Sequence, residues 1–289
     1  DSIFPSTWQP GLAHSRFLRQ LLSARPDVVD WLHGHIDAPL NAGHMREFLS
    51  AQAVSDENSL KSALRRLRQR VMATLIVRDL GGQAALAEVV ETMTQLAEIT
   101  TNFAACFIHR QLATQFGEPL DAQGQAQRLL IVGMGKLGGR ELNVSSDVDY
   151  IFIYPEDGET AGSPENGRRI EVYDFFTRLG KRLIAALGEI TGDGQVFRVD
   201  MRLRPNGDSG PLVASFDMLE NYFITQGREW ERYAWIKARV MTGIRGAELA
   251  AIARPFIFRK YLDFGAINAM RDLHAQIRRE VARKDMADH

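Results

Sequence analysis

Cysteine and long apolar runs are almost absent from this sequence, and both absences narrow the kind of protein it encodes. The single Cys106 among 289 residues leaves no partner for a disulfide and no cysteine pair for a zinc site. Such usage is typical of a reducing compartment, so we expect a cytoplasmic protein. No apolar run approaches the about 20 residues of a membrane-spanning helix, and the first residues do not resemble a signal peptide. We therefore expect no membrane partner.

An excess of one charge is also missing. The chain carries 35 Lys and Arg against 36 Asp and Glu, which gives a formal net charge of −1. This balance provides no overall field that would draw the chain onto nucleic acid, and we expect no nucleic-acid partner. The length allows two domains of ordinary size. Because the sequence starts without Met and stops within a charged helical pattern, we expect a piece of a longer protein.

Helical periodicity dominates residues 1–120, which we predict to form an N-terminal helical domain. Pro26 is placed to open one helix, at a position where its missing N–H is harmless. Ser55 or Asp56 is placed to cap a long helix, and a Gly-Gly pair stops that helix. A further helix, dense in apolar residues, is predicted from about 84 to 116.

Several residues of this region suggest functions, but each has a simpler structural interpretation. His33 and His35 are two apart and do not share a helix face, so we expect exposed or capping histidines, not metal ligands. Cys106 stands among apolar residues and is interpreted as a buried structural thiol. The arginine-rich run Arg65–Arg70 is interpreted as one solvated helix face, although it could also read an anionic partner.

Residues 117–127 are rich in Gly, Pro, Asp and Gln and mark a domain boundary. Strands then alternate with helices, so we predict an α+β fold with a core at 121–215 and a C-terminal helical region at 216–289. The expected strands cover 129–133, 147–154 and 195–204, and the expected helices cover 166–190, 216–226, 229–241, 247–261 and 264–287.

A glycine-rich turn follows the first expected strand. Its G-x-G-x-x-G pattern alone is weak evidence for a dinucleotide site, and too few residues precede Asp147 for the crossover helix of such a unit. A P-loop is excluded because Leu137, not Ser or Thr, follows Lys136. We predict instead that Gly138 and Gly139 open a short helix whose free N–H groups hold phosphate oxygens, with Lys136 adding charge.

Two aspartates open the second expected strand. Asp147 and Asp149 are two residues apart, so both side chains point to one face, whereas Val148 and Tyr150 point to the other. Adjacent like charges on one face are costly unless a cation lies between them. A pair of divalent ions about 3.5–4 Å apart would remove this cost, and oxygen ligands favour Mg²⁺ or Mn²⁺.

The third expected strand adds one more carboxylate. Asp200 alternates with core residues and is flanked by Arg198, Arg202 and Arg204 on the same face. We predict that Asp200 completes the metal site and that Arg202 and Arg204 neutralise phosphate charge. The alternative is a surface strand whose charges form a ladder of ion pairs.

A later helical segment carries further basic and aromatic residues. Lys237 or Arg239 could reach a phosphate, although an exposed charged face explains either equally well. Trp230 and Trp235 are interpreted as packing residues in preference to base-stacking residues.

Three segments together resemble the bifunctional glutamine-synthetase adenylyltransferase/adenylyl-removing enzymes, a family within the polymerase-β-like nucleotidyltransferase superfamily. The resemblance implies a mixed sheet with helices, flanked by helical regions at both ends. The segments are similar to the first half of that family, which removes AMP from a glutamine-synthetase tyrosine by phosphorolysis and yields ADP. The three segments that carry the resemblance are GMGKLGGRELNVSSDVDYIF, VDMRLRPNGDSGPLVASF and GREWERYAWIKARV.

The resemblance also implies roles for individual residues. It assigns catalysis and metal binding to Asp147, Asp149 and Asp200. Tyr150 departs from the family, which usually has Leu there, and we expect its side chain to point away from the metals. The residues expected to bind nucleotide or phosphate are Gly138, Gly139, Lys136, Ser146, Arg202, Arg204 and Lys237.

Partners follow from the resemblance as well. It implies adenylylated glutamine synthetase as substrate, the uridylylated PII signal protein as regulator and an adenylyltransferase half elsewhere in the chain, all serving regulation of nitrogen assimilation. Mg²⁺ or Mn²⁺, phosphate and ADP or ATP are the implied small ligands. The family's first half continues past the point where this sequence stops, so the piece alone is expected to be compromised in stability and activity. Two alternatives stay open: ATP-dependent adenylylation, and a non-catalytic docking module for glutamine synthetase or PII.

Overall fold

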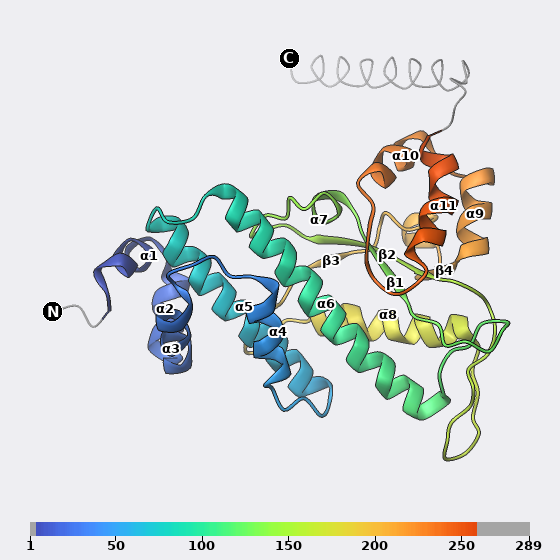
Figure 1. The fold of residues 1–289 in the computed structure, drawn as a ribbon, viewed down its shortest axis with the longest axis horizontal. Helices are drawn as coiled ribbons and strands as arrows, with labels where there is room; N and C mark the ends of the chain where they lie inside the picture. Colours follow the sequence, from blue (N-terminus) through green and yellow to red (C-terminus); the bar gives the residue numbers. More distant parts are fainter. Residues whose placement is uncertain (1–3, 259–289) are drawn as a thin grey trace, which may run out of the picture.

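The computed structural model describes residues 4–258. In this part of the chain a mixed five-stranded sheet lies between two groups of helices (Figure 1). The N-terminal helices and one later helix cover one face, and the C-terminal helices cover the other. The predicted α+β class is confirmed. None of the helices in the described residues is long and apolar enough to cross a membrane.

Local capping signals placed the N-terminal helices correctly. Pro26 opens its helix, and the Asp56 side chain accepts a hydrogen bond from the Ser59 N–H at 2.7 Å, as a capping residue should. Two short helices, α1 and α4, were not predicted. The elements are η1 (Ser6–Trp8), α1 (Gln9–His14), α2 (Arg16–Ala24), α3 (Pro26–His35), α4 (Ala42–Ser50), α5 (Glu57–Leu80) and α6 (Leu86–Phe116).

The sheet has the order β3-β2-β1-β5, and β4 also pairs with β2. Strand β2 runs antiparallel to β1 and parallel to both β3 and β4, so the predicted mixed sheet is confirmed. Strand β5 pairs antiparallel with the other side of β1. The strands are β1 (Leu130–Gly133), β2 (Val148–Tyr154), β3 (Val199–Asp200), β4 (Val213–Ser215) and β5 (Arg239–Thr242).

Two of the sequence predictions for this sheet are wrong. The strand expected at 195–204 shrinks to β3, because the chain turns after Asp200. The helix expected at 229–241 ends at Ile236, and the residues after it form β5, where pairing with the free side of β1 overrides helical propensity. The sheet therefore extends beyond the predicted core of 121–215. The helix predicted at 264–287 lies outside the described residues.

Alternating side chains of β2 bury both faces of the sheet. Tyr150 and Phe152 pack towards α6 and α8 (Val172–Gly188), whereas Ile151 and Ile153 pack towards the C-terminal helices. The helices on that second face are α9 (Phe216–Thr225), α10 (Glu229–Ile236) and α11 (Gly246–Ile257).

The arginine run on α5 is not a solvated face. Arg65 is fully buried and donates to the carbonyl oxygens of Ala186 at 2.9 Å and Gly194 at 2.8 Å, which ties α5 to the end of α8. Arg70 is buried too and forms an ion pair with Asp27. Because one apolar cluster runs from α4 through the sheet to β4, the helical region and the sheet share a core despite the predicted boundary.

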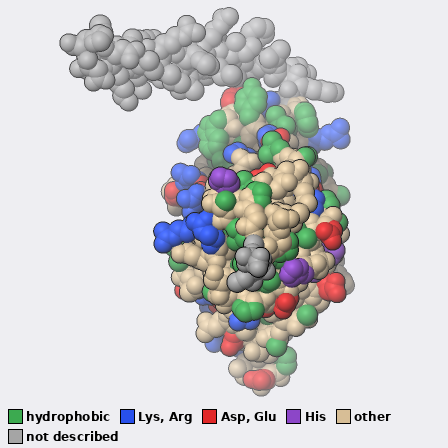
Figure 2. Space-filling view, turned by 90° about the vertical axis from the view of Figure 1, so that its left-hand side faces the viewer, with side chains coloured by type: hydrophobic (Ala, Val, Ile, Leu, Met, Phe, Trp, Pro, Cys, Tyr) green, Lys and Arg blue, Asp and Glu red, His purple; other side chains and the backbone are tan. Residues whose placement is uncertain are grey.

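The surface residues of the N-terminal half match some predictions and contradict one. His33 is exposed, as expected, and His35 stacks on Trp31 with ring centroids 3.6 Å apart. Cys106 is exposed, so the prediction of a buried thiol is wrong. Figure 2 shows side chains of both charge signs, with scattered hydrophobic ones, on the face at this end of the molecule.

Candidate functional site

Strands β2 and β3 bring the predicted carboxylates together. Asp149 and Asp200 are direct partners in the parallel register of these two strands, and Asp147 precedes β2 by one residue. Val148 and Tyr150 lie on the opposite face, as predicted, and both are fully buried. The Tyr150 hydroxyl lies 2.6 Å from Thr101 Oγ1 on α6. The substitution at Tyr150 therefore affects packing against α6 and leaves the acidic face unchanged.

The half-buried Asp149 is electrostatically strained in the metal-free protein. Its pKa is raised from an ordinary 3.8 to about 6, first by burial and then by the negative charges of Asp200 and Asp147. Arg202 opposes this shift only weakly. The effect of two neighbouring carboxylates on a third shows that the three negative charges converge on one side of the sheet.

Two of the three carboxylates are paired with flanking arginines. Arg198 Nε lies 2.6 Å from Asp147 Oδ1, and Arg202 Nε lies 2.8 Å from Asp200 Oδ2. The Arg202 contact holds the pKa of Asp200 below its ordinary value. Both guanidinium groups are mainly exposed, with 67% and 73% of the side-chain surface accessible. Ion pairs of this exposed kind contribute little stability, so a stronger cation can replace them.

The ion pairs of Asp147 and Asp200 with arginines affect whether these carboxylates can bind a metal ion. No group of three His, Cys, Asp or Glu in residues 4–258 is arranged to hold a metal ion, and Asp147 and Asp200 are paired with arginines instead. The donor set is nevertheless the oxygen-only set that Mg²⁺ and Mn²⁺ prefer, and the strained Asp149 supplies uncompensated negative charge between the pairs. The residues therefore fit a divalent cation once the two arginine pairs open. That these carboxylates bind metal stays a prediction.

The predicted role of Arg204 needs correction. Its guanidinium donates to the carbonyl oxygens of Met201 at 2.9 Å and Asp208 at 3.1 Å, and only 12% of its side chain is accessible. These bonds close the loop that follows β3. Arg204 therefore supports the loop, and its donors are not free for a phosphate.

The glycine turn begins its helix earlier than predicted. Helix α7 (Gly135–Gly138) ends where the sequence suggested that it starts. The N–H groups of Gly138 and Gly139 already donate to the carbonyls of Met134 at 2.9 Å and Gly135 at 3.1 Å, so the predicted phosphate cradle at these two residues is wrong. The amides without an intrahelical partner belong to the first turn instead, beginning at Gly135.

The start of the turn lies against the acidic face. The Met134 N–H donates to the Asp149 carbonyl at 2.9 Å. A Cβ on Gly135 would lie 2.8 Å from Asp149 Oδ2, and the residue has a φ of +54°. Glycine is required here for two reasons, a left-handed backbone and the close carboxylate. The turn and the carboxylates thus form one site, as the spacing predicted.

Arg239, which the sequence suggested as a possible phosphate ligand, instead holds this turn from behind. Arg239 on β5 donates to the carbonyls of Leu137 at 2.9 Å and Gly138 at 3.1 Å, and it also pairs with Glu98 on α6. Arg140 pairs with the same glutamate at 3.1 Å. Arg239 therefore stabilises the turn and is not a phosphate ligand. No local sequence pattern predicted its contact with α6.

The other predicted binding residues lie around the same turn. Lys136 is exposed on α7, and Ser146 is half-buried just before β2. Lys237 is exposed and forms an ion pair with Glu141 at 2.9 Å, beside the end of α7. The positions of these three residues are compatible with phosphate binding, and their roles stay predictions.

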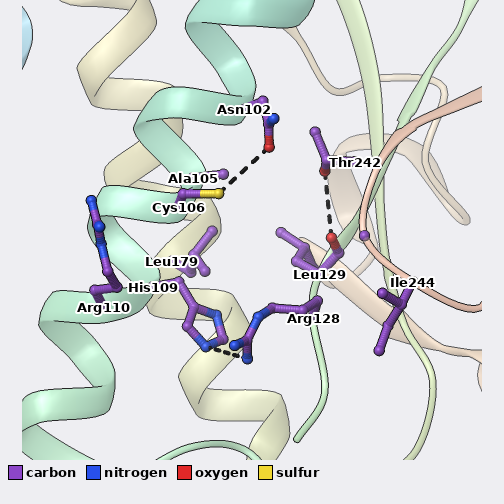
Figure 3. A pocket seen from close by; sticks show the side chains of 11 residues that line it. Asn102, Ala105, Cys106, His109, Arg110, Arg128, Leu129, Leu179, Thr242 and Ile244 are labelled. Atoms are coloured by element: carbon purple, nitrogen blue, oxygen red, sulfur yellow. Dashed lines mark hydrogen bonds between the residues drawn. The ribbon is translucent and has the colours of Figure 1, made fainter. Parts of the chain in front are cut away.

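A separate cavity of about 440 Å³ lies between α6 and the ends of β1 and β5 (Figure 3). His109 and Arg128 face each other in it, with Arg128 Nη1 2.9 Å from His109 Nε2. Glu118 lies 2.7 Å from both side chains and balances the Arg128 charge, whereas burial lowers the pKa of His109. None of the predicted site residues lines this cavity, so it is distinct from the carboxylate site.

The strain at Asp149 leads to a first prediction. The folded state binds the Asp149 proton more tightly than the unfolded chain does, so the ionised carboxylate destabilises the fold above pH 6. Asp149→Asn should therefore raise the free energy of unfolding of the metal-free protein at pH 8 by about 1–2 kcal/mol, after discounting for partial exposure. The gain should vanish below about pH 4, where both states are protonated. Urea unfolding in EDTA at both pH values measures it, and an equal gain at both would contradict the electrostatic cause.

Comparison with known proteins identifies the site's family. A family model described as glutamate-ammonia ligase adenylyltransferase matches residues 9–253. The chain belongs to this family. The match includes all three aspartates, the glycine turn and β5, so the site described above lies wholly within the family region.

Individual relatives carry a more specific name. A bifunctional glutamine synthetase adenylyltransferase/adenylyl-removing enzyme from Aromatoleum aromaticum is 57% identical over 289 residues, covering 100% of this chain. Proteins of the same name from Chromobacterium violaceum and Nitrosomonas europaea are 55% and 53% identical, covering 95% and 96% of the chain. The chain spans about 30% of the length of each of these curated relatives. It therefore matches part of relatives whose names give two activities.

Proposed function

We propose that this chain carries the adenylyl-removing activity of its family. The substrate is adenylyl-tyrosine on glutamine synthetase, inorganic phosphate is the nucleophile, and the products are ADP and unmodified glutamine synthetase. The convergence of Asp147, Asp149 and Asp200 supports a nucleotidyl-transfer site. The choice of direction rests on the wording of the motifs, notably ELN before SSDVD and GDSGPLV after RLRP, which resembles the family's first half.

The reaction exchanges one bond at phosphorus for another. A phosphate oxygen attacks the adenylyl phosphorus, the bond to the tyrosine oxygen breaks, and tyrosinate leaves and takes a proton from water. Phosphate is already a competent nucleophile, so positioning and charge stabilisation provide most of the acceleration. Mg²⁺ or Mn²⁺, held by the three aspartates, would supply Lewis-acid stabilisation of the entering and leaving oxygens.

The chain's own residues then have defined tasks. The three carboxylates would hold the cation on the acidic face of the sheet. Arg202, mainly exposed beside Asp200, would then be free to bind the phosphate oxygens. Lys136, Ser146 and Lys237 lie around the glycine turn, where cationic and hydroxyl donors reach the same oxygens.

The regulatory partners are proposed on the same basis. The resemblance supports control by the uridylylated PII protein and opposition by an adenylyltransferase half in the complete enzyme. The lengths of the relatives support a larger protein, since this chain spans about 30% of them.

The experiment that tests the proposal compares two directions. We expect the chain, with Mg²⁺ or Mn²⁺, to release ADP from adenylylated glutamine synthetase in the presence of inorganic phosphate. The same protein with unmodified glutamine synthetase and ATP should transfer no labelled AMP. Transfer from ATP without phosphorolysis would reverse the proposed direction. Binding of glutamine synthetase with neither reaction, in a protein that also fails to bind Mn²⁺, would indicate a docking module.

A further inference from the structure

A small polar cavity opens next to the carboxylates. Its volume is about 230 Å³, and it lies between the loop after β3, the end of α9 and the start of α10. Arg202 forms part of its wall and also contacts Asp200, so the cavity and the acidic site share one side chain. A volume below the roughly 300–1,000 Å³ of drug-sized ligand pockets suits a single base and excludes a whole nucleotide.

The floor of this cavity is fixed by buried hydrogen bonds. The Tyr222 hydroxyl donates to Glu231 Oε1 at 2.7 Å, and the Arg228 N–H donates to Glu231 Oε2 at 2.9 Å. Tyr222 and Glu231 are both buried. On the loop side, Asn206 has a φ of +62°, and a Cβ on Gly210 would lie 2.0 Å from the Pro205 carbonyl. Both walls are therefore held in shape before any ligand binds.

The cavity offers an aromatic face and two uncommitted amides. Trp230 lines it with 49% of its surface exposed, whereas Trp235 is only 5% exposed and packs edge-on against Phe223. The interpretation as a packing residue is thus confirmed for Trp235, whereas Trp230 is half-exposed. Within residues 4–258, the side-chain amides of Asn206 and Gln226 form no hydrogen bond, and both residues line the cavity. An indole stacks on a base, and a carboxamide pairs with adenine through one donor and one acceptor.

The local charges favour a neutral base over a second phosphate. The Arg204 guanidinium is bonded to backbone carbonyls, and that of Arg202 is bonded to Asp200. The buried Glu231 places a carboxylate in the floor, which repels an anion. Among the lining residues that the structure describes, the side chains without a hydrogen bond are the two neutral amides, the Trp230 indole and the Arg228 guanidinium, and the buried Glu231 carboxylate balances the Arg228 charge.

We propose that this cavity, formed by Trp230, Gln226 and Asn206, binds the adenine base of the adenylyl group. The inference rests on the proposed nucleotidyl transfer and adds its base subsite. Trp230 supplies the stacking face, the two amides read the edge of the base, and Arg202 marks the direction in which the phosphate lies. The cavity then accounts for a preference for adenylyl over other nucleotidyl groups.

Calorimetric titration with adenosine tests the base subsite independently of the reaction. Adenosine carries no phosphate and needs no metal, so its binding is measured in EDTA. Trp230→Ala should weaken adenosine binding by at least about tenfold, since stacking on one aromatic residue is typically worth that much. Gln226→Ala should reduce the preference for adenosine over cytidine. Tyr233→Ala is the matched control, because Tyr233 is an exposed aromatic on α10 (60% accessible) outside the cavity lining.

Two further readouts separate stacking from misfolding. Adenosine should quench indole fluorescence in the parent chain and in Tyr233→Ala, and Trp230→Phe should retain most of the affinity because a smaller ring still stacks. Equal adenosine affinity in Trp230→Ala and the parent, or no adenosine binding at all, would overturn the base subsite. Adenosine binding with the predicted losses, together with failed phosphorolysis, would support the subsite and reject only the proposed reaction.

Discussion

Asp200→Asn is expected to lower phosphate-dependent release of ADP from adenylylated glutamine synthetase by at least about a thousandfold, or about 4 kcal/mol of barrier. Asp200 faces Asp149 directly across β2 and β3, so an amide there removes a negative charge from the centre of the acidic face. Asp147→Asn should act in the same direction. The fold should persist, because among residues 4–258 the Asp200 carboxylate bonds only to the exposed Arg202 side chain and to the Arg202 N–H.

Asp208→Asn is the matched control for this loss. Asp208 lies in the loop after β3, and 78% of its side chain is accessible. Its ion pair with Arg204, at 3.5 Å, is long and exposed at the carboxylate end. The control should keep near-parental turnover, with circular dichroism and thermal unfolding showing that all variants are folded. Retained turnover in Asp200→Asn or Asp147→Asn would remove the metal-site assignment.

Gly138→Ala is expected to destabilise the protein by about 3 kcal/mol or more. A Cβ at this position would lie 2.0 Å from the Lys237 carbonyl and 2.5 Å from the Gly133 carbonyl. Both obstacles are backbone atoms of the sheet and its neighbouring turn, so neither moves without breaking β1 or the start of β5. In a protein of this size the loss corresponds to a fall in Tm of about 10 °C.

Gly139→Ala provides a neighbouring control with the same chemical change. The nearest atoms to its added Cβ are side-chain atoms of Glu141 and Lys237 at 3.4 Å, and its φ is −77°. This variant should unfold within about 0.5 kcal/mol of the parent, as a surface substitution does. Scanning calorimetry of both variants checks the difference. Equal stability of the pair would show that the turn is not wedged between β1 and the segment before β5.

Gly138 and Gly139 show which features of the turn could not be predicted from the sequence. The pattern around Gly138 and Gly139 correctly indicated a tight turn next to aspartates. It assigned these two residues to phosphate binding, but their N–H groups are used inside α7 and the close approach at Gly138 is to backbone. Which residue begins a four-residue helix depends on its neighbours in space, and no cap signal in the sequence marks it.

The hydrogen-bond partners of several arginines could not be predicted from the sequence either. Arg65, Arg204 and Arg239 all looked like exposed or phosphate-binding cations in the sequence. In the structure each donates to backbone carbonyls of a distant or neighbouring segment and holds it in place. A guanidinium has five N–H donors, and many of its acceptors are backbone carbonyls. Because every residue has a backbone carbonyl, the sequence does not indicate which ones an arginine will bind.

The sequence by itself determined the features that depend on near neighbours. These are the helix starts at Pro26 and Asp56, the two-residue alternation of β2 that separates Asp149 from Tyr150, and the identity of the acidic residues. Only the tertiary structure decided that Asp200 stands beside Asp149, that β5 completes the sheet, and that Trp230 is left open beside the acidic site. Pairing across tens of residues is governed by the packing of whole elements, and local propensity carries no information about it.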